Sequence, residues 1–134
     1  MQPLLLDTCV VIWLTEKAPL APAAVEALRA NAGATYISPI TAWEVGMLAA
    51  RGRLQFLIRP ERWFANLFDV QGVLLADMSP DLLIASSYLP GKPPRDPTDR
   101  IIAATARELG ALLVTRDRAL LEYGEAGHIA AMAC

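Results

Sequence analysis

Carboxylate side chains recur in this sequence where short apolar runs end. Asp7 directly follows the apolar run at 4–6, and Asp117 comes just after another in the segment LLVTRD. Asp99 lies in the polar, proline-rich segment GKPPRDPTD, and Glu44 lies in the apolar segment ITAWEVGMLAARG. Short continuous apolar runs are typical of buried strands. The four acids are therefore candidates for one site beyond the ends of strands.

The elements that must position these acids alternate between strands and helices. Buried strands are expected at 4–6, 35–37, 73–75 and 111–114, with a weaker one near 128–132. Helices are expected at 22–32, after the Ser38-Pro39 start, from Pro60, from Ser79, through Leu109 and around 119–123, while 10–14 extends the first strand or opens a helix. This order predicts an α/β fold with a mainly parallel sheet. Ligand sites in such sheets lie beyond the carboxyl ends of the strands.

Each acid also has a purely structural interpretation. Asp7 and Asp117 suit polar turns after strands. Asp96 suits the N-cap of a helix whose first residue is Pro97, and Asp99 then lies in the first turn, where the helix dipole favours it. A single Glu44 on a helix is usually solvated, although its neighbours Trp43 and Val45 are apolar.

The four acids taken together point to a divalent cation. Converging carboxylates repel one another, and one must stay protonated unless a cation offsets the charge. A ligand set of oxygen atoms without His or Cys favours Mg²⁺ or Mn²⁺ over zinc. Such a site is suited to hydrolysis of phosphodiesters, because the ion lowers the pKa of a bound water and stabilises charge on phosphoryl oxygens.

Four segments in this order resemble the PIN-domain ribonucleases, specifically the VapC-like toxins of type II toxin–antitoxin pairs. They are LLLDTCVVIWL, SPITAWEVGMLAARGRL, RDPTDRIIAATA and LLVTRD. The resemblance implies a three-layer α/β/α sandwich formed by one domain, residues 1–134. It also implies an endoribonuclease dependent on Mg²⁺ or Mn²⁺, an RNA substrate, a homodimer, and a cognate antitoxin that occludes the site.

The resemblance assigns roles to individual residues. It implies that the metal is bound by Asp7, Glu44, Asp99 and Asp117. It also implies that the Thr115 hydroxyl supports the site and that Asp96 supports the metal ligands without binding the metal itself. Thr8 and Arg116 are adjacent candidates to which it gives no role. The sequence departs from the family pattern at Cys9, Pro94 and Thr98, where His, His and Phe are common, and these departures leave the four acids intact.

Composition limits the remaining possibilities. The chain has 134 residues, 54% of them hydrophobic, and a net charge of −2. The high hydrophobic content excludes a disordered chain, and its excess indicates a surface that a partner covers. The negative net charge excludes binding to nucleic acid through bulk positive charge. The two cysteines form no disulfide framework. The sequence shows no signal peptide and no membrane-spanning run, so a cytoplasmic location and no membrane partner are expected.

Several other features have mainly structural interpretations. Cys9 is expected to be a small buried hydrophobe, His128 a tail or partner-surface residue, and Trp13, Trp43 and Trp63 core residues. Arg51 and Arg53 are candidates for contacts with RNA phosphates, but a solvated helix end is the favoured interpretation. Arg100 is expected to pair with Asp96, whereas Lys92 and Arg95 are candidates for contacts with the substrate backbone.

Three other function classes compete with the nuclease. A receiver domain would need paired acids after the first strand and a mid-chain phospho-acceptor Asp, but Asp7 stands alone. A haloacid-dehalogenase-like phosphatase would need Asp-x-Asp, but position 9 is Cys. A non-catalytic PIN-like interaction module remains open, and metal binding separates it from the enzyme.

Overall fold

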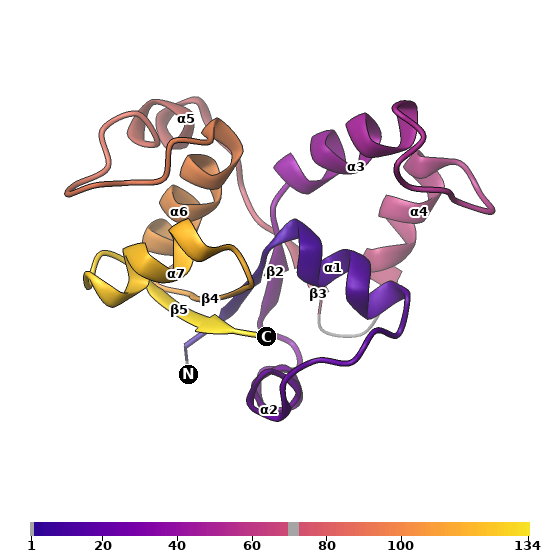
Figure 1. Ribbon diagram of the computed structural model, residues 1–134, viewed down its shortest axis with the longest axis horizontal. Coiled ribbons are helices and arrows are strands. Elements are labelled where there is room, and N and C mark those ends of the chain that lie inside the picture. Colours follow the sequence, from indigo (N-terminus) through magenta and orange to yellow (C-terminus); the bar gives the residue numbers. More distant parts are fainter. Residues whose placement is uncertain (1, 70–72) are drawn as a thin grey trace.

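A parallel five-stranded sheet forms the centre of the computed structural model, which describes residues 2–69 and 73–134 (Figure 1). The strand order is β3-β2-β1-β4-β5, and every pairing is parallel. The strands are β1 (Leu4–Leu6), β2 (Thr35–Ile37), β3 (Val73–Leu75), β4 (Leu112–Thr115) and β5 (Ala130–Ala133). The α/β fold with a parallel sheet is thus confirmed.

Helices connect the strands. They are α1 (Thr8–Thr15), α2 (Pro22–Ala30), α3 (Ile40–Ala50), α4 (Pro60–Asn66), the 3₁₀ turn η1 (Leu67–Asp69), α5 (Pro80–Ala85), α6 (Pro97–Leu109) and α7 (Arg118–Glu125). Their starts follow local signals: Ser79 and Asp96 cap α5 and α6, and a proline follows each cap. Gly110 ends α6 in the left-handed conformation, with φ of 62°, a conformation that glycine adopts without steric cost.

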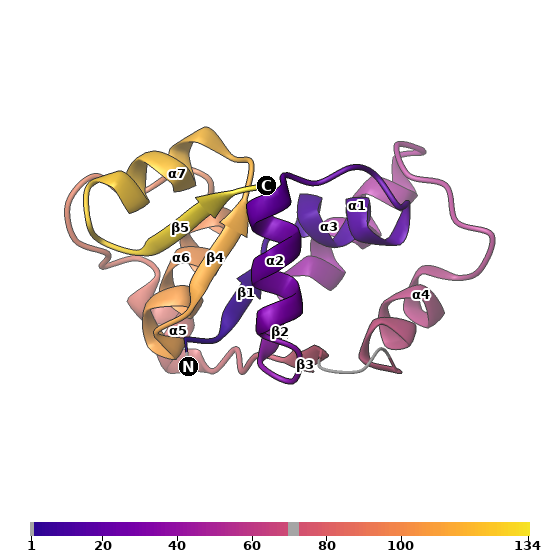
Figure 2. The same ribbon diagram turned by 90° about the horizontal axis from the view of Figure 1, so that it is seen from below.

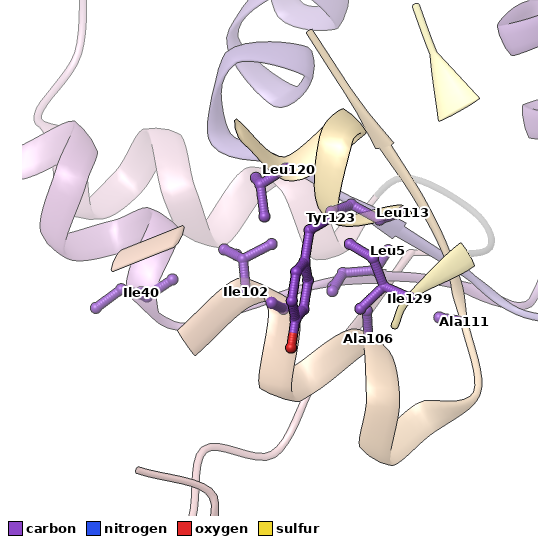
Figure 3. Close-up of a cluster of buried hydrophobic side chains, with 10 residues drawn as sticks. Leu5, Ile40, Ile102, Ala106, Ala111, Leu113, Leu120, Tyr123 and Ile129 are labelled. Carbon is purple, nitrogen blue, oxygen red and sulfur yellow. The ribbon is translucent and has the colours of Figure 1, made fainter. Parts of the chain in front are cut away.

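Two hydrophobic clusters lie on opposite faces of the sheet and make the molecule three-layered. Alternate residues of β1 divide between them, with Leu5 in one and Leu4 and Leu6 in the other. The first cluster packs α6 and α7 against the sheet, with Tyr123 at its centre (Figure 3). The second packs α1, α2 and η1 on the opposite face, and the two sets of helices are separated in both ribbon views (Figures 1 and 2).

Two expectations about burial were wrong. Trp43, expected in the core, is 55% exposed. Strand β3 lies at the sheet edge, and its Leu74 and Leu75 are 42% and 52% exposed. An apolar run alone does not distinguish an edge strand from a central one.

No helix in the described ranges is both long and apolar enough to cross a lipid bilayer.

Candidate active site

The carboxyl ends of β1 and β4 bring Asp7 and Asp117 to the same edge of the sheet. Leu6 is paired with Val114, so the residues that follow the two strands are neighbours. The Thr115 hydroxyl links them: it donates to Oδ2 of Asp7 at 2.7 Å and accepts from the Asp117 amide at 2.9 Å. Thr115 is fully buried, so these two bonds hold the two acids in a defined relation.

Both aspartates also cap helices. Oδ1 of Asp7 accepts from the Thr8 amide at 2.8 Å at the start of α1, and Oδ2 of Asp117 accepts from the Leu120 amide at 3.0 Å at the start of α7. An N-terminal helix dipole favours a negative charge at each position. The structural interpretation of these residues is therefore correct as far as it goes, and it also fixes their orientation.

Threonine hydroxyls position Glu44, which is half-buried on α3. The Thr8 hydroxyl donates to Oε1 of Glu44 at 2.7 Å and lies 3.0 Å from the buried Thr41 hydroxyl. Because the proton of Thr8 is directed to Glu44, Thr41 is the donor in the second contact. Sequence reasoning gave Thr8 no role and missed Thr41, although Thr41 precedes Glu44 by three residues and so lies on the same helix face.

Asp96 and Thr98 approach Glu44 from the start of α6. Oδ1 of Asp96 accepts from the Thr98 amide at 2.8 Å, from the Thr98 hydroxyl at 2.6 Å and from the Asp99 amide at 3.4 Å. The Thr98 hydroxyl also lies 3.4 Å from Oε2 of Glu44. Thr98, noted only as a departure from the family pattern, thus connects the α6 cap to Glu44.

Burial and mutual repulsion shift the titration of these acids. Burial raises the pKa of Asp7, and the hydrogen bond from Thr115 opposes it. Burial likewise raises the pKa of Glu44. Burial, followed by the negative charges of Asp117, Asp7, Asp96 and Glu44, raises the pKa of Asp99 to about 7. The Thr98 hydroxyl lowers the pKa of Asp96.

No lysine or arginine among the described residues forms an ion pair with these acids, since the three ion pairs there lie elsewhere. The expected pair between Arg100 and Asp96 is accordingly not formed. Within residues 2–69 and 73–134, no cationic side chain offsets the charge of these carboxylates through an ion pair.

The donor chemistry of the site suits a hard divalent cation. Its side chains present carboxylate and hydroxyl oxygens, the ligands that Mg²⁺ and Mn²⁺ prefer. In the described ranges, no three acidic, His or Cys side chains are already gathered as ligands of one ion. Mutual repulsion of the carboxylates favours such separation in the absence of a cation.

Arg116 and Cys9 lie beside the site and have different roles. The Arg116 guanidinium stacks 3.5 Å from the Trp13 ring centroid and donates to the carbonyls of Cys134 and Pro19. It therefore fastens β5 and the α1–α2 connection together. Burial raises the pKa of the Cys9 thiol to about 12, so Cys9 stays protonated and is a poor nucleophile.

Comparisons with known proteins agree on one family. Residues 4–126 match the PIN domain family. The chain is 35% identical over 124 residues to Ribonuclease VapC22 of Mycobacterium tuberculosis, covering 92% of this chain and 93% of that protein. The DNA-bound VapBC of Salmonella typhimurium is 25% identical with a TM-score of 0.64, covering 99% of this chain and 98% of that one. VapBC2 of Rickettsia felis, bound to a promoter DNA fragment, is 16% identical with a TM-score of 0.67, covering 98% of each chain, and shows the likeness of fold alone.

Proposed function

The chain belongs to the PIN domain family, and from that premise we propose that it is a metal-dependent endoribonuclease acting as the toxin of a toxin–antitoxin pair. It hydrolyses phosphodiester bonds of RNA. The relative named Ribonuclease VapC22 supports the ribonuclease activity. The observation that carries the proposal is the cluster of acids at one sheet edge, where burial and then the charges of the neighbouring acids raise the pKa of Asp99 to about 7 and where no acid has an ion-pair partner among the described residues.

The proposed metal ligands are Asp7, Glu44, Asp99 and Asp117, and the ion is Mg²⁺ or Mn²⁺. When bound, the ion lowers the pKa of a coordinated water and stabilises negative charge on the phosphoryl oxygens. The Thr115 hydroxyl keeps Oδ2 of Asp7 in place at 2.7 Å, and the Thr8 hydroxyl does the same for Oε1 of Glu44. The Asp99 carboxylate makes no hydrogen bond among the described residues, so it is free to turn toward an incoming ion or water.

Cleavage of RNA by the purified chain tests the proposal directly. We expect cleavage with Mg²⁺ or Mn²⁺, none with EDTA, and none by Asp7→Asn or Asp99→Asn with the metal present. The Asp99 variant is the cleaner one, because Asp7 accepts hydrogen bonds at both carboxylate oxygens, from the Thr8 amide and the Thr115 hydroxyl, and asparagine can accept at only one. A folded Asp99→Asn protein that cleaves at the wild-type rate would contradict the assignment of Asp99.

Metal-dependent melting distinguishes the enzyme from the non-catalytic PIN-like module. A ligand that binds only the folded state raises the melting temperature. Stabilisation by Mg²⁺ or Mn²⁺ in the wild type, reduced in Asp99→Asn, supports the metal site independently of any RNA. A chain that neither binds the ions nor cleaves RNA is the interaction module instead.

The partners we propose are a second copy of the chain and a cognate antitoxin. The VapBC of Salmonella typhimurium, 25% identical to this chain, supports the antitoxin. Trp43 is 55% exposed and directly precedes Glu44, so it offers an apolar contact at the border of the acid site. A segment bound over Trp43 would cover Glu44 and prevent access of RNA.

A further inference from the structure

A hollow of about 500 Å³ lies between α7 and the chain segment that leads into α6. Lys92 and Arg95 line it from that segment, Glu122 and Tyr123 line it from α7, and His128 closes one side. None of these residues belongs to the acid site.

Tyr123 and His128 give the hollow an ordered floor. Tyr123 is 2% exposed, and its hydroxyl donates to the Pro90 carbonyl at 2.6 Å. Its ring centroid lies 4.9 Å from that of His128. Figure 3 shows the ring of Tyr123 among the buried side chains of the cluster, with the hydroxyl at its outer end. His128, expected to be a tail or partner-surface residue, thus also packs against Tyr123.

Gly91 brings the loop backbone directly against this floor. A Cβ atom at position 91 would overlap Nε2 of the His128 imidazole, and the φ of Gly91 is 69°. Both facts require glycine here, because a side chain would strain the backbone and collide with the imidazole ring. The loop that carries Lys92 and Arg95 is therefore held at both Pro90 and Gly91.

The hollow is positively charged although the chain as a whole is not. Lys92 and Arg95 are exposed and take part in no ion pair among the described residues. The one acid in the lining, Glu122, lies 4.0 Å from Nη1 of Arg118. Arg107 and Arg100 also act on Tyr123, where their positive charges oppose the rise of its pKa caused by burial.

The two walls of the hollow are continuous with the elements that carry the acids. Arg95 directly precedes Asp96, the N-cap of α6, and α7 begins immediately after Asp117. A polyanion bound to Lys92 and Arg95 would therefore lie along the two elements whose first residues follow Asp96 and Asp117. The acids themselves repel phosphate, so a neighbouring cationic surface is needed to hold the strand.

We infer that this hollow binds a phosphodiester group of the RNA strand beside the one that is cleaved, with Lys92 and Arg95 as its contacts. The identity of the strand as RNA rests on the proposed function. The Arg95 guanidinium can form two parallel hydrogen bonds to one phosphate, and Lys92 adds a point charge. No metal takes part in this contact, so it persists in EDTA.

Binding of a fluorescein-labelled single-stranded RNA, followed by anisotropy in EDTA, tests the inference. We expect the double variant Lys92→Ala/Arg95→Ala to bind about tenfold more weakly, and the slope of log affinity against log salt to fall by about 1.4 for two lost phosphate contacts. Arg51→Ala/Arg53→Ala, which removes the same charge after α3, is the matched control and should bind like the wild type. Thermal melts confirm that both variants are folded.

Three outcomes would overturn the inference. The first is an equal loss of RNA affinity in both double variants. The second is an RNA affinity of the Lys92→Ala/Arg95→Ala variant that equals that of the wild type. The third is the absence of RNA binding by the wild type in EDTA. Cleavage of the same RNA in Mg²⁺ is measured separately. A wild type that cleaves RNA while the Lys92/Arg95 variant binds normally refutes only the hollow, whereas a wild type that binds RNA but cannot cleave it refutes only the proposed function.

Discussion

The hydroxyl of Thr115 donates a hydrogen bond of 2.7 Å to Oδ2 of Asp7, from a position 108 residues further along the chain. It accepts a hydrogen bond from the Asp117 amide at the same time, so one buried side chain connects two acids that follow different strands. A hydroxyl is suited to this position because it donates and accepts at once.

Thr115→Val should weaken metal binding and cleavage roughly 10- to 100-fold, the usual cost of removing a group that orients a metal ligand. Valine keeps the shape of threonine but leaves Oδ2 of Asp7 without its donor. Thr115→Ser, which keeps the hydroxyl, should retain most of the activity. Cleavage rates at a series of Mg²⁺ concentrations measure both effects, and equal rates in Val and Ser variants would contradict the role.

Thr98→Val should have a similar but smaller effect, about tenfold on cleavage. Its hydroxyl donates to Oδ1 of Asp96 at 2.6 Å and lies 3.4 Å from Oε2 of Glu44, so valine removes the donor of Asp96 and the polar contact beside Glu44. Thr98→Ser is the control. A Val variant that matches the Ser variant in cleavage rate and melting temperature would show that this contact positions nothing.

Asp99→Asn should stabilise the metal-free fold at alkaline pH. The pKa of Asp99 is about 7 in the folded protein against 3.8 ordinarily, so the folded state binds more protons between these values and stability falls as pH rises through them. Asparagine removes this cost. Because solvent reaches and screens Asp99, we expect a gain of only about 1 kcal/mol at pH 8.

Urea unfolding in EDTA measures this gain. At pH 3.5, below the ordinary pKa, the wild type and Asp99→Asn should have the same free energy of unfolding. A variant that is less stable than the wild type at pH 8 would mean that Asp99 is not under electrostatic strain.

The purified chain should form a dimer through the face made by β3 and α5. Exposed apolar residues gather there: Leu74, Leu75, Leu83, Ile84 and Tyr88. Two hollows beside β3 and α5 share Glu108 as a lining residue, so the two elements present one surface. An unpaired edge strand next to apolar side chains is a surface that another chain tends to cover.

Light scattering measures this association. Leu75→Lys/Ile84→Lys should shift the chain toward the monomer mass, whereas Leu57→Lys, in the loop after α3, should not, although Leu57 is fully exposed. A wild type that stays monomeric at high concentration would exclude self-association. Equal masses of the wild type and all variants would show that the dimer interface does not lie on β3 and α5.

Local patterns in the sequence determined the class of fold and where the acids fall. Apolar runs, Ser-Pro and Asp-Pro starts and glycine stops depend on neighbouring residues only, and they placed Asp7, Asp96, Asp99 and Asp117 at strand ends and helix starts. In a parallel sheet these positions lie at one edge, so a shared edge could be predicted from the sequence. That Asp7 and Asp117 are neighbours at this edge depends on the pairing of β1 with β4.

Tertiary structure alone decided the strand order and the hydrogen bonds of the site, because both depend on contacts between residues far apart in the chain. The order β3-β2-β1-β4-β5 placed β3 at the edge and left Leu75 exposed. The bonds from Thr8 and Thr98 to Glu44 join residues 36 and 54 positions apart. No periodicity encodes such distances, because hydroxyl and carboxylate meet only after the helices have packed. The sequence thus determined which groups could do the chemistry, and packing decided which hydroxyls hold them in place.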